Sequence, residues 1–295
     1  MVDGAGACGD EGRRTQWCTP VGAAELLLRA PDAHRKPLVL LQRQGPPSQD
    51  RAGRWGLPNA AWRSDETPEG RALRIAQTIG VPPGRLRMRG ERVDRQRADR
   101  RCTTTVIADV SAPLPGQAGR VDAELAWVPE PEVVARDLHP AFAARWPALQ
   151  APETGLLVDA ANVVGSRPDG WWRDRAGAAE RLLRDIAAAA PGVLAVSADL
   201  VRWVTRPVVV LEGAAKRAPD VPGLEVIRAP GSGDDTIVDV ARRGGEWVVV
   251  TADRGLRSRL PSGARPVGPS TLRSWLSPAA GGWLPPERRR RGDAQ

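Results

Sequence analysis

The hydrophobic positions in the second half of the chain form short runs that alternate with amphipathic segments. The apolar runs are typical of strands, and they fall at 156–158, 194–197, 208–211, 224–227 and 247–250. Segments of helical composition lie between or after them, at 173–190, 234–243 and 271–276. Strands that alternate with helices typically form a mainly parallel sheet with helices on both faces. We therefore expect an α/β domain over residues 154–277.

The first half shows a mixed pattern of strands and helices. Strand-like runs fall at 23–29, 37–43, 101–110 and 125–128, and one or two short helices are expected within 129–146. The segment 67–79 has helical composition, with Pro68 at the first helical position, where proline is tolerated. These elements predict a second α/β domain over residues 19–150, which joins the other through the stretch 147–154.

Both ends of the chain differ from these two segments in composition. Residues 1–18 read as a disordered leader, and the first ten are small and polar or acidic, unlike a secretory signal. Residues 278–295 are rich in Pro, Gly and Arg, which predicts a disordered tail that is solvated or, in the alternative, contacts RNA. No apolar stretch reaches the about 18 residues that a membrane helix needs. The 3 scattered cysteines lack metal-binding spacing, so the pattern favours a cytoplasmic protein with reduced thiols and no membrane partner.

The net charge of +8 comes almost wholly from arginine, since Lys36 and Lys216 are the only lysines. Guanidinium groups pair well with phosphates, and a basic surplus attracts nucleic acid in general. However, the chain has no Tyr and is rich in Ala, Arg, Gly and Pro, which indicates a nucleotide-composition bias of the genome. The charge alone therefore does not decide for a nucleic-acid partner.

Carboxylates stand at three places where a predicted strand ends or a predicted helix begins. Asp159 follows the run 156–158, Asp253 follows the run 247–250, and Asp234 and Asp235 open the helix at 234–243. Residues just past the carboxyl ends of parallel strands meet in one crevice. Carboxylates gathered there repel one another unless a cation lies between them, and their oxygen atoms suit Mg²⁺ or Mn²⁺. The sequence thus predicts a metal site.

Helix capping is the alternative role for each of these carboxylates, because Asp is a common N-cap residue. Asp253 would cap the short segment that follows it, and one of the adjacent pair Asp234 and Asp235 would cap its helix. One cap does not explain two neighbouring carboxylates. Three such places within one domain favour the metal site over capping alone.

The motifs at these places resemble a known family. Val-Asp-Ala-Ala-Asn at 158–162, Gly-Asp-Asp-Thr-Ile at 233–237 and Val-Thr-Ala-Asp-Arg at 250–254 look like the YacP-like members of the NYN branch of the PIN-like nucleases. The resemblance covers roughly 154–276 and implies an α/β/α sandwich with ribonuclease activity. By this resemblance, three carboxylates would be metal ligands: Asp159, Asp234 and Asp253. By the same resemblance, Asn162 would orient a ligand, a water or the scissile phosphate, and Asp235 would be an additional carboxylate.

The chemistry of a ribonuclease explains why such residues gather. Phosphodiester hydrolysis needs an activated water and neutralised charge on the phosphoryl oxygens, and bound Mg²⁺ or Mn²⁺ provides both. Arg254, Arg175 and Lys216 are candidates for phosphate contacts with single-stranded RNA, although solvation at the surface is the commoner role of such residues. Either Trp171 or its neighbour Trp172 could stack on a base; we favour the alternative in which both pack the start of the helix against the sheet.

A second resemblance concerns the first half of the chain. Trp-Gly-Leu-Pro-Asn-Ala at 55–60, Asp-Glu-Thr-Pro-Glu at 65–69 and Ala-Leu-Arg at 72–74 look like the Nudix hydrolases, over roughly residues 20–148. The resemblance implies an α/β/α sandwich with a mixed sheet. The family motif G-x5-E-x7-R-E-U-x-E-E-x-G-U places its metal-binding glutamates on one helix. Glu66 and Arg74 match two of its positions.

The catalytic part of this second motif is degenerate. The segment 75–80 reads Ile-Ala-Gln-Thr-Ile-Gly, so all three glutamates expected after Arg74 are missing, and the spacing to Gly80 is one residue short. Gln and Thr are poor substitutes for carboxylates at a divalent cation. We therefore expect a Nudix fold without the usual pyrophosphohydrolase activity. Glu66 is expected to be structural, and His139 is expected to pack or cap a helix rather than act as a base.

An arginine-rich segment follows the degenerate motif. Its arginines are Arg85, Arg87, Arg89, Arg92, Arg95, Arg97, Arg100 and Arg101. In an extended segment alternate side chains share a face, so Arg85, Arg87 and Arg89 are predicted to line up side by side. They would grip the RNA backbone or, equally well, form a solvated strand protected by charge.

Three functions are compatible with the sequence. The first is a metal-dependent ribonuclease that uses the carboxylates of 154–277, with the Nudix-like domain as a nucleotide- or RNA-binding or docking module. The second is a Nudix-type nucleoside diphosphate pyrophosphohydrolase with displaced metal ligands. The third is a non-catalytic RNA- or nucleotide-binding adaptor. The residues alone favour the ribonuclease, because only the second domain retains its carboxylates.

Overall fold

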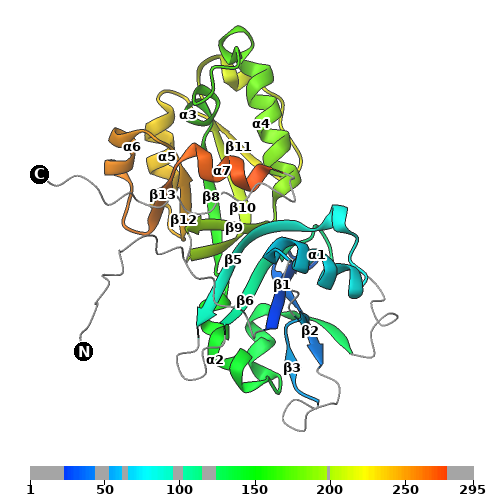
Figure 1. Cartoon of the computed structure of the whole chain (residues 1–295). Coiled ribbons are helices and arrows are strands. Elements are labelled where there is room, and N and C mark those ends of the chain that lie inside the picture. Colours follow the sequence, from blue (N-terminus) through cyan, green and yellow to red (C-terminus); the bar gives the residue numbers. More distant parts are fainter. Residues whose placement is uncertain are drawn as a thin grey trace, which may run out of the picture.

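Two β-sheets with their helices lie one above the other in the molecule (Figure 1). The computed structural model describes residues 23–43, 53–61, 66–95, 102–114, 124–197 and 200–277. The predicted leader at 1–18 and the predicted tail at 278–295 lie outside these residues. Several arginines of the arginine-rich segment, at 96–101, also lie outside them.

The N-terminal sheet is mixed and has seven strands within the described residues. They are β1 (Ala23–Pro31), β2 (Pro37–Arg43), β3 (Trp55–Gly56), β4 (Asn59–Ala61), β5 (Arg87–Arg95), β6 (Cys102–Asp109) and β7 (Leu125–Pro129). Their order is β3-β2-β1-β6-β5, with β4 beside β1 and β7 beside β2. The pairing of β1 with β6 is parallel and the others are antiparallel. The strands predicted from the apolar runs are all present.

Helix α1 (Pro68–Thr78) covers one face of this sheet. The Thr67 hydroxyl accepts a hydrogen bond from the Gly70 amide at 3.1 Å, so Thr67 caps the helix. Ala72 and Ile75 pack from the helix onto strand residues such as Leu26. The short helices η1 (Pro83–Arg85) and η3 (Glu130–Ala135) complete this part of the chain, and α2 (Pro140–Leu149) packs on the opposite face.

The C-terminal sheet has six strands in the described part of the chain. They are β8 (Glu153–Asp159), β9 (Gly192–Ser197), β10 (Leu200–Leu211), β11 (Glu225–Arg228), β12 (Trp247–Val250) and β13 (Ala264–Val267). The order β11-β10-β8-β12-β13 is parallel throughout, and β9 pairs with β10 in an antiparallel hairpin. This hairpin and the strand β13 were not predicted.

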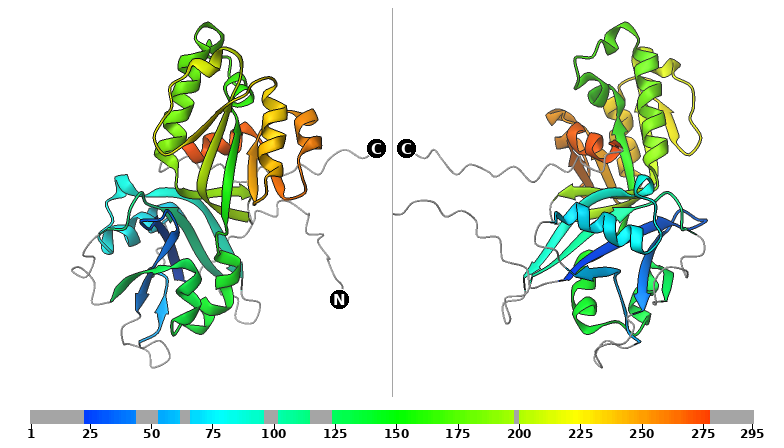
Figure 2. Two further views of the ribbon diagram at one scale, coloured as in Figure 1. Left: turned by 180° about the vertical axis from the view of Figure 1, so that it is seen from behind. Right: turned by 45° about the vertical axis from the view of Figure 1, so that its right-hand side comes forward.

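Helices cover both faces of the C-terminal sheet. They are α3 (Ala160–Gly165), η4 (Trp171–Arg173), α4 (Arg175–Ala189), η5 (Gly213–Arg217), α5 (Gly233–Arg242), α6 (Arg254–Arg259) and α7 (Pro269–Leu276). The helices α3, α4 and α7 share one apolar core with the sheet, while α5 and α6 share the other. Figure 2 shows α4 and α5 standing on opposite sides of the strands. The predicted α/β architecture with helices on both faces is present.

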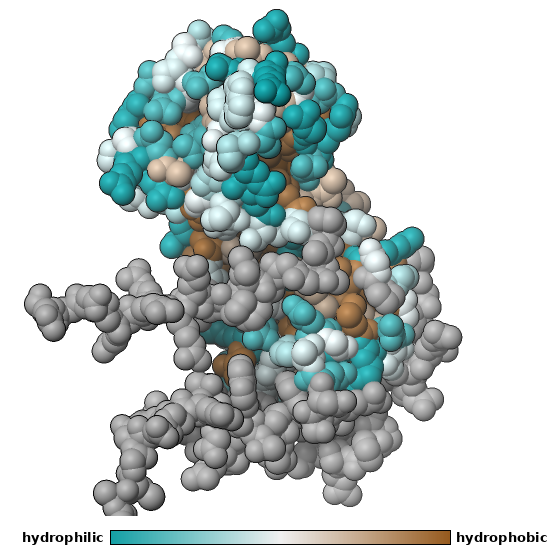
Figure 3. Space-filling view, turned by 45° about the horizontal axis from the view of Figure 1, so that its top comes forward, coloured by the Kyte–Doolittle hydropathy of each residue, from teal (hydrophilic) through white to brown (hydrophobic). Residues whose placement is uncertain are grey.

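The outer surface of this unit is mostly hydrophilic in the face that Figure 3 shows. The apolar residues lie inside instead: Leu156 and Leu157 of β8 are fully buried and point into the two different cores. Among the described residues no helix is both long enough and apolar enough to span a membrane.

The two sheets share a hydrophobic core where they meet. Val193 of β9 and Trp203 of β10 pack in one cluster with Leu27 of β1 and Trp146 of α2. The Trp203 Nε1–H also donates to the Arg35 carbonyl oxygen at 2.8 Å. The chain passes from one sheet to the other between α2 and β8, within the predicted boundary stretch. The β9–β10 hairpin therefore fastens the second unit onto the first.

A buried ionic cluster lies at the same junction. The Asp109 carboxylate has no exposed surface, and it pairs with Arg87 Nε at 2.5 Å and with Arg89 Nε at 2.6 Å. It also accepts the amide hydrogen of Val193 at 3.0 Å. The two guanidinium groups donate further to main-chain carbonyls of the C-terminal unit, namely those of Ala188, Ala189, Pro191 and Trp275.

This cluster corrects one prediction. Arg85 ends the short helix η1 and is not part of the strand, so it does not line up with the other two. Arg87 and Arg89 do lie side by side, but they face the second unit and not the solvent. Burial lowers the pKa of the Arg87 guanidinium, and the Asp109 carboxylate partly offsets that effect. Neither guanidinium group is free to grip an RNA backbone in this arrangement.

Asp109→Asn removes the charge that both guanidinium groups face and changes the shape of the side chain little. We expect the free energy of unfolding to fall by about 3–5 kcal/mol, as when one partner of a buried ion pair is removed. Urea unfolding followed by circular dichroism measures the change. Glu180→Gln, which removes the exposed pair with Arg184 in α4, is the control and should cost about 0.5 kcal/mol or less. A loss for Asp109→Asn no larger than that of the control would contradict this role.

Candidate functional site

The strand order places a crevice at the carboxyl ends of β8 and β12. From β8 the chain builds β10 and β11 on one side, and it then crosses to build β12 and β13 on the other side. The connections therefore leave β8 and β12 in opposite directions. In open parallel sheets such a switch point is where ligands bind.

Asp159 ends β8 and stands at this switch point. It is 8% exposed, and its two carboxylate oxygens each accept one hydrogen bond. Oδ1 accepts from the Asn162 amide at 2.9 Å, which caps α3, and Oδ2 accepts from the Thr251 hydroxyl at 2.9 Å. The side chain is thereby held in one orientation between the two strand ends.

Asn162 and Thr251 connect the ends of β8 and β12. The Asn162 Oδ1 accepts the Ala252 amide hydrogen at 2.8 Å, and the Thr251 hydroxyl accepts the Asp253 amide hydrogen at 3.1 Å. Asp253 in turn caps α6, since its Oδ1 accepts from the Leu256 amide at 2.7 Å. The capping role that the sequence suggested for Asp253 is present.

The start of α5 differs from the predicted arrangement. Its N-cap is Ser232, whose hydroxyl accepts the Asp235 amide hydrogen at 3.4 Å, so neither Asp234 nor Asp235 caps the helix. Asp235 is exposed and forms an ion pair with Arg259 of α6. Asp234 is half-buried beside it in the first turn.

The pKa values show that the predicted carboxylates interact with one another. Burial raises the pKa of Asp159, and the negative charges of Asp234 and Glu212 raise it further against the opposing effect of its hydrogen bonds. Burial also raises the pKa of Asp234, and the charges of Asp253 and Glu212 add to this effect. The structure thus brings Asp159, Asp234 and Asp253 into one electrostatic neighbourhood.

Glu212 is a member of this neighbourhood that the sequence analysis missed. It follows β10 directly, and its Oε2 accepts the Gly233 amide hydrogen at 2.9 Å at the start of α5. The signal was present, because the apolar run 208–211 ends on this carboxylate in the same way as the runs before Asp159 and Asp253. We name Asp159, Glu212, Asp234 and Asp253 the acidic crevice.

The acidic crevice has the donor chemistry for a hard cation, because all four side chains offer carboxylate oxygens. Within the described residues, however, no three Asp, Glu, His or Cys side chains stand close enough together to hold a metal ion. The metal-ligand roles of Asp159, Asp234 and Asp253 therefore stay predictions. A bound cation would need these side chains to approach one another.

The side chains predicted to contact nucleic acid differ in how exposed they are and in what they contact. Trp172 is 51% exposed and meets Trp171 edge to face, so the favoured prediction that both tryptophans pack against the sheet is wrong. The Arg175 guanidinium lies 5.3 Å from the Trp171 ring, and Arg254 is exposed at the start of α6. Lys216 instead donates to the Ala229 carbonyl oxygen at 3.1 Å.

In the N-terminal unit, Glu66 is held by two arginines of α1. Its carboxylate accepts from Arg74 at 2.8 Å and from Arg71 at 3.1 Å. The hydrogen bond from Arg74 is the main cause that lowers the pKa of Glu66 to about 2, and burial opposes it. Glu66 thus stabilises the loop before the helix, as expected. His139 accepts the Ala141 amide hydrogen at 3.3 Å and caps α2, also as expected.

The residues that stand where the Nudix motif has glutamates, Ile75, Thr78 and Ile79, contribute to the packing and hydrogen bonding of α1. Ile75 and Ile79 are each 2% exposed in the core below the helix, and the Thr78 hydroxyl donates to the Arg74 carbonyl oxygen.

Two other carboxylates, those of Glu69 and Glu91, lie near this helix. Glu91 of β5 stands opposite Val106 on the α1 face of the sheet; burial raises its pKa, and the charge of Glu69 at the start of α1 adds to this.

The charge of Glu66 should make stability depend on pH. A carboxylate whose pKa is lowered by folding contributes stability that is complete above its ordinary pKa and is lost as the pH falls through the folded value. For Glu66 this window runs from about 4.5 down to about 2. We expect Glu66→Gln to be less stable than wild type at pH 7 and to approach it as the pH falls through this window. Urea unfolding at a series of pH values measures this, with Glu180→Gln as the control; a constant difference between the curves would contradict it.

The comparisons with known proteins concern the N-terminal part of the chain. No protein-family model matches. Two curated proteins, both named putative 8-oxo-dGTP diphosphatase 3 and from two strains of Mycobacterium tuberculosis, are 44% identical over 143 residues, which is 46% of this chain. The chain spans 65% of the length of these relatives.

The solved structures that this chain resembles include Nudix proteins. The Nudix hydrolase RenU from M. smegmatis is 40% identical, with a TM-score of 0.38, over 43% of this chain and 82% of that one. A mutT/nudix family protein from Listeria innocua is 17% identical, with a TM-score of 0.35, over 44% of this chain and 91% of that one. On the sequence identities, the N-terminal region of this chain is Nudix-hydrolase-like.

Proposed function

We propose that the chain is a divalent-metal-dependent hydrolase of nucleoside diphosphate derivatives that acts through its Nudix-like region. The observation that carries this proposal is the 44% identity over 143 residues with a putative 8-oxo-dGTP diphosphatase. It takes precedence over the ribonuclease favoured by the residues alone, because the comparisons support the Nudix-like region and give no support to a nuclease.

The catalytic carboxylates of this proposal are displaced from the family positions. Glu69 lies in the first turn of α1 and Glu91 on the face of the sheet that α1 covers, and the charge of Glu69 raises the pKa of Glu91. Two carboxylates suffice for Mg²⁺ or Mn²⁺ when water and the substrate phosphates complete the coordination. The bound cation would activate a water and neutralise charge on the diphosphate. Glu66 and Arg74 hold the loop that leads into α1 and so position Glu69.

A second candidate function is metal-dependent hydrolysis of single-stranded RNA at the acidic crevice. The observation that favours it is the electrostatic interaction among four carboxylates around the switch point of a parallel sheet, which contributes to the raised pKa values of Asp159 and Asp234. Asn162 and Thr251 would keep Asp159 oriented toward the cation. Trp171 of η4 would then contact a base of the RNA, and Arg175 at the start of α4 would contact a phosphate.

One set of assays distinguishes the two candidates. The protein is incubated with 8-oxo-dGTP, with ADP-ribose and with labelled single-stranded RNA, each with Mg²⁺, with Mn²⁺ or with EDTA. We expect nucleotide hydrolysis that stops with EDTA and falls at least about 100-fold in Glu91→Gln, since even the partners of metal ligands cost up to this much when mutated. Asp159→Asn should leave nucleotide hydrolysis unchanged.

The other outcomes are equally informative. Cleavage of RNA that is lost in Asp159→Asn and kept in Glu91→Gln would support the acidic crevice and overturn the first proposal. Unfolding curves for both variants control for loss of the fold. Absence of turnover with every substrate and metal would contradict both candidates and favour a nucleotide-binding adaptor.

A further inference from the structure

A cavity of about 350 Å³ opens at the amino ends of β8, β12 and β13. Its lining residues come from these strands, from β10 and from the loops that lead into β12 and β13: Thr154, Arg202, Glu246, Trp247, Val248, Ser262, Gly263, Ala264, Arg265 and Pro266. The acidic crevice lies at the opposite, carboxyl ends of the same strands. We propose that this cavity is a binding site for a small phosphate monoester, such as a phosphorylated sugar.

The base of the cavity is rigidly built. The ring of Trp247 packs so closely over Gly155 that a side-chain carbon on Gly155 would lie 2.5 Å from it. The Arg206 guanidinium lies 4.5 Å from the centre of the same ring. The Glu246 carbonyl oxygen accepts from the Gly155 amide at 2.9 Å and from the Thr154 hydroxyl at 3.0 Å. The start of β12 is therefore fixed, and with it the main chain of Glu246 at the edge of the cavity.

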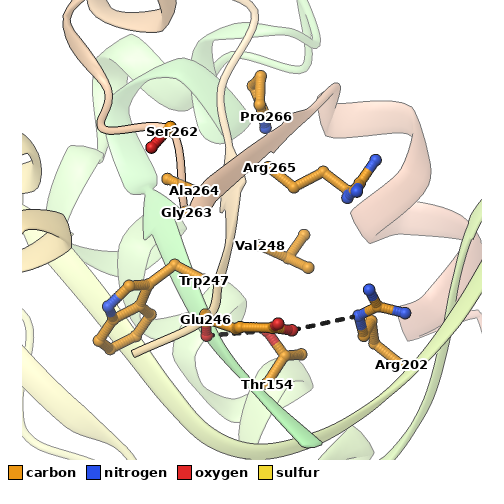
Figure 4. A pocket seen from close by; sticks show the side chains of 10 residues that line it. All are labelled: Thr154, Arg202, Glu246, Trp247, Val248, Ser262, Gly263, Ala264, Arg265 and Pro266. Carbon is orange, nitrogen blue, oxygen red and sulfur yellow. Dashed lines mark hydrogen bonds and ion pairs between the residues drawn. The ribbon is translucent and has the colours of Figure 1, made fainter. Parts of the chain in front are cut away.

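Two guanidinium groups give the cavity its positive character. In Figure 4 the side chains of Arg202 and Arg265 lie on the same side of the cavity, and the Trp247 ring turns to the other side. Arg265 is exposed on the edge strand β13, where its main chain pairs with β12. Its side chain makes no hydrogen bond or ion pair with any residue in the described part of the chain. Arg202 donates through one nitrogen, Nη1, to the Val201 carbonyl oxygen at 3.1 Å, and its Nε lies 3.7 Å from the Glu246 carboxylate. Both groups thus retain donors for a ligand.

The polar groups define the chemistry of the ligand. Two neighbouring guanidinium groups suit the oxygens of a phosphate, because each presents paired N–H donors to an anion. The Glu246 carboxylate accepts hydrogen bonds and therefore favours a ligand that also carries a hydroxyl or amino group. A cavity of this volume falls at the small end of the about 300–1,000 Å³ that is usual for small-molecule sites. A sugar phosphate meets all three conditions.

Equilibrium dialysis with ribose 5-phosphate, with inorganic phosphate and with ribose tests this assignment. We expect saturable binding of ribose 5-phosphate that is tighter than that of inorganic phosphate and that weakens with added salt, while ribose binds least. Arg265→Ala should weaken the affinity at least about 10-fold, as expected when a hydrogen bond to a charged group is lost. The side chain is exposed, so the variant should keep the fold, which urea unfolding verifies.

The matched control is Arg181→Ala, which removes an exposed arginine of α4 far from the lining residues and should leave the affinity unchanged. Glu246→Gln should narrow the preference for ribose 5-phosphate over inorganic phosphate. Equal losses in Arg265→Ala and Arg181→Ala would mean attraction by overall charge and would overturn the site. No saturable binding of either phosphate by the wild-type protein would overturn it as well.

Discussion

The burial of one carboxylate, Asp109, is the constraint on which the arrangement of the two sheets depends. A charge removed from water is stable only if other groups replace the hydration that it loses. Here two guanidinium groups and the Val193 amide provide that replacement, and they come from both sheets. The same guanidinium groups donate to carbonyl oxygens that end α4 and α7. The ionic cluster and the shared apolar core around Trp203 therefore require the two units to dock in one orientation.

That docking could not be predicted from the sequence, for a physical reason. A run of charged residues usually forms a solvated surface. Such residues become buried only when they pair with groups that lie far away in the chain, and the local sequence does not identify those groups. Asp109 and Val193 are separated by 84 positions, and Arg89 and Trp275 by 186. The first half of β10 was missed for a related reason, since Arg202 and Arg206 interrupt its apolar residues. Whether a short segment forms a strand or a helix, by contrast, depends mainly on residues close to it in the chain. For that reason most of the strands and helices were predicted correctly.

The sequence pattern located members of the acidic crevice but did not predict their geometry. Apolar runs that end on a carboxylate located Asp159 and Asp253, and the same rule applied to the run at 208–211 would have added Glu212. Helix capping does not exclude a carboxylate from the crevice. Each carboxylate oxygen has more than one lone pair, so Asp159 and Asp253 cap their helices and still present oxygens to the crevice. What the pattern did not contain is the spacing between the side chains, which depends on how β8, β10 and β12 stagger.

The Nudix-like region poses the opposite problem, because the fold is retained while its metal-binding residues are replaced. Ile75 and Ile79 occupy positions of the degenerate motif, and both are buried against the sheet. That face of α1 now contributes apolar contacts to the core, and a glutamate placed there would meet hydrocarbon instead of a cation. The change is therefore part of the packing of α1 and not only a loss of ligands. Hydrolysis by this region would therefore need carboxylates outside that face, and among the described residues Glu69 and Glu91 interact with each other on the α1 side of the sheet.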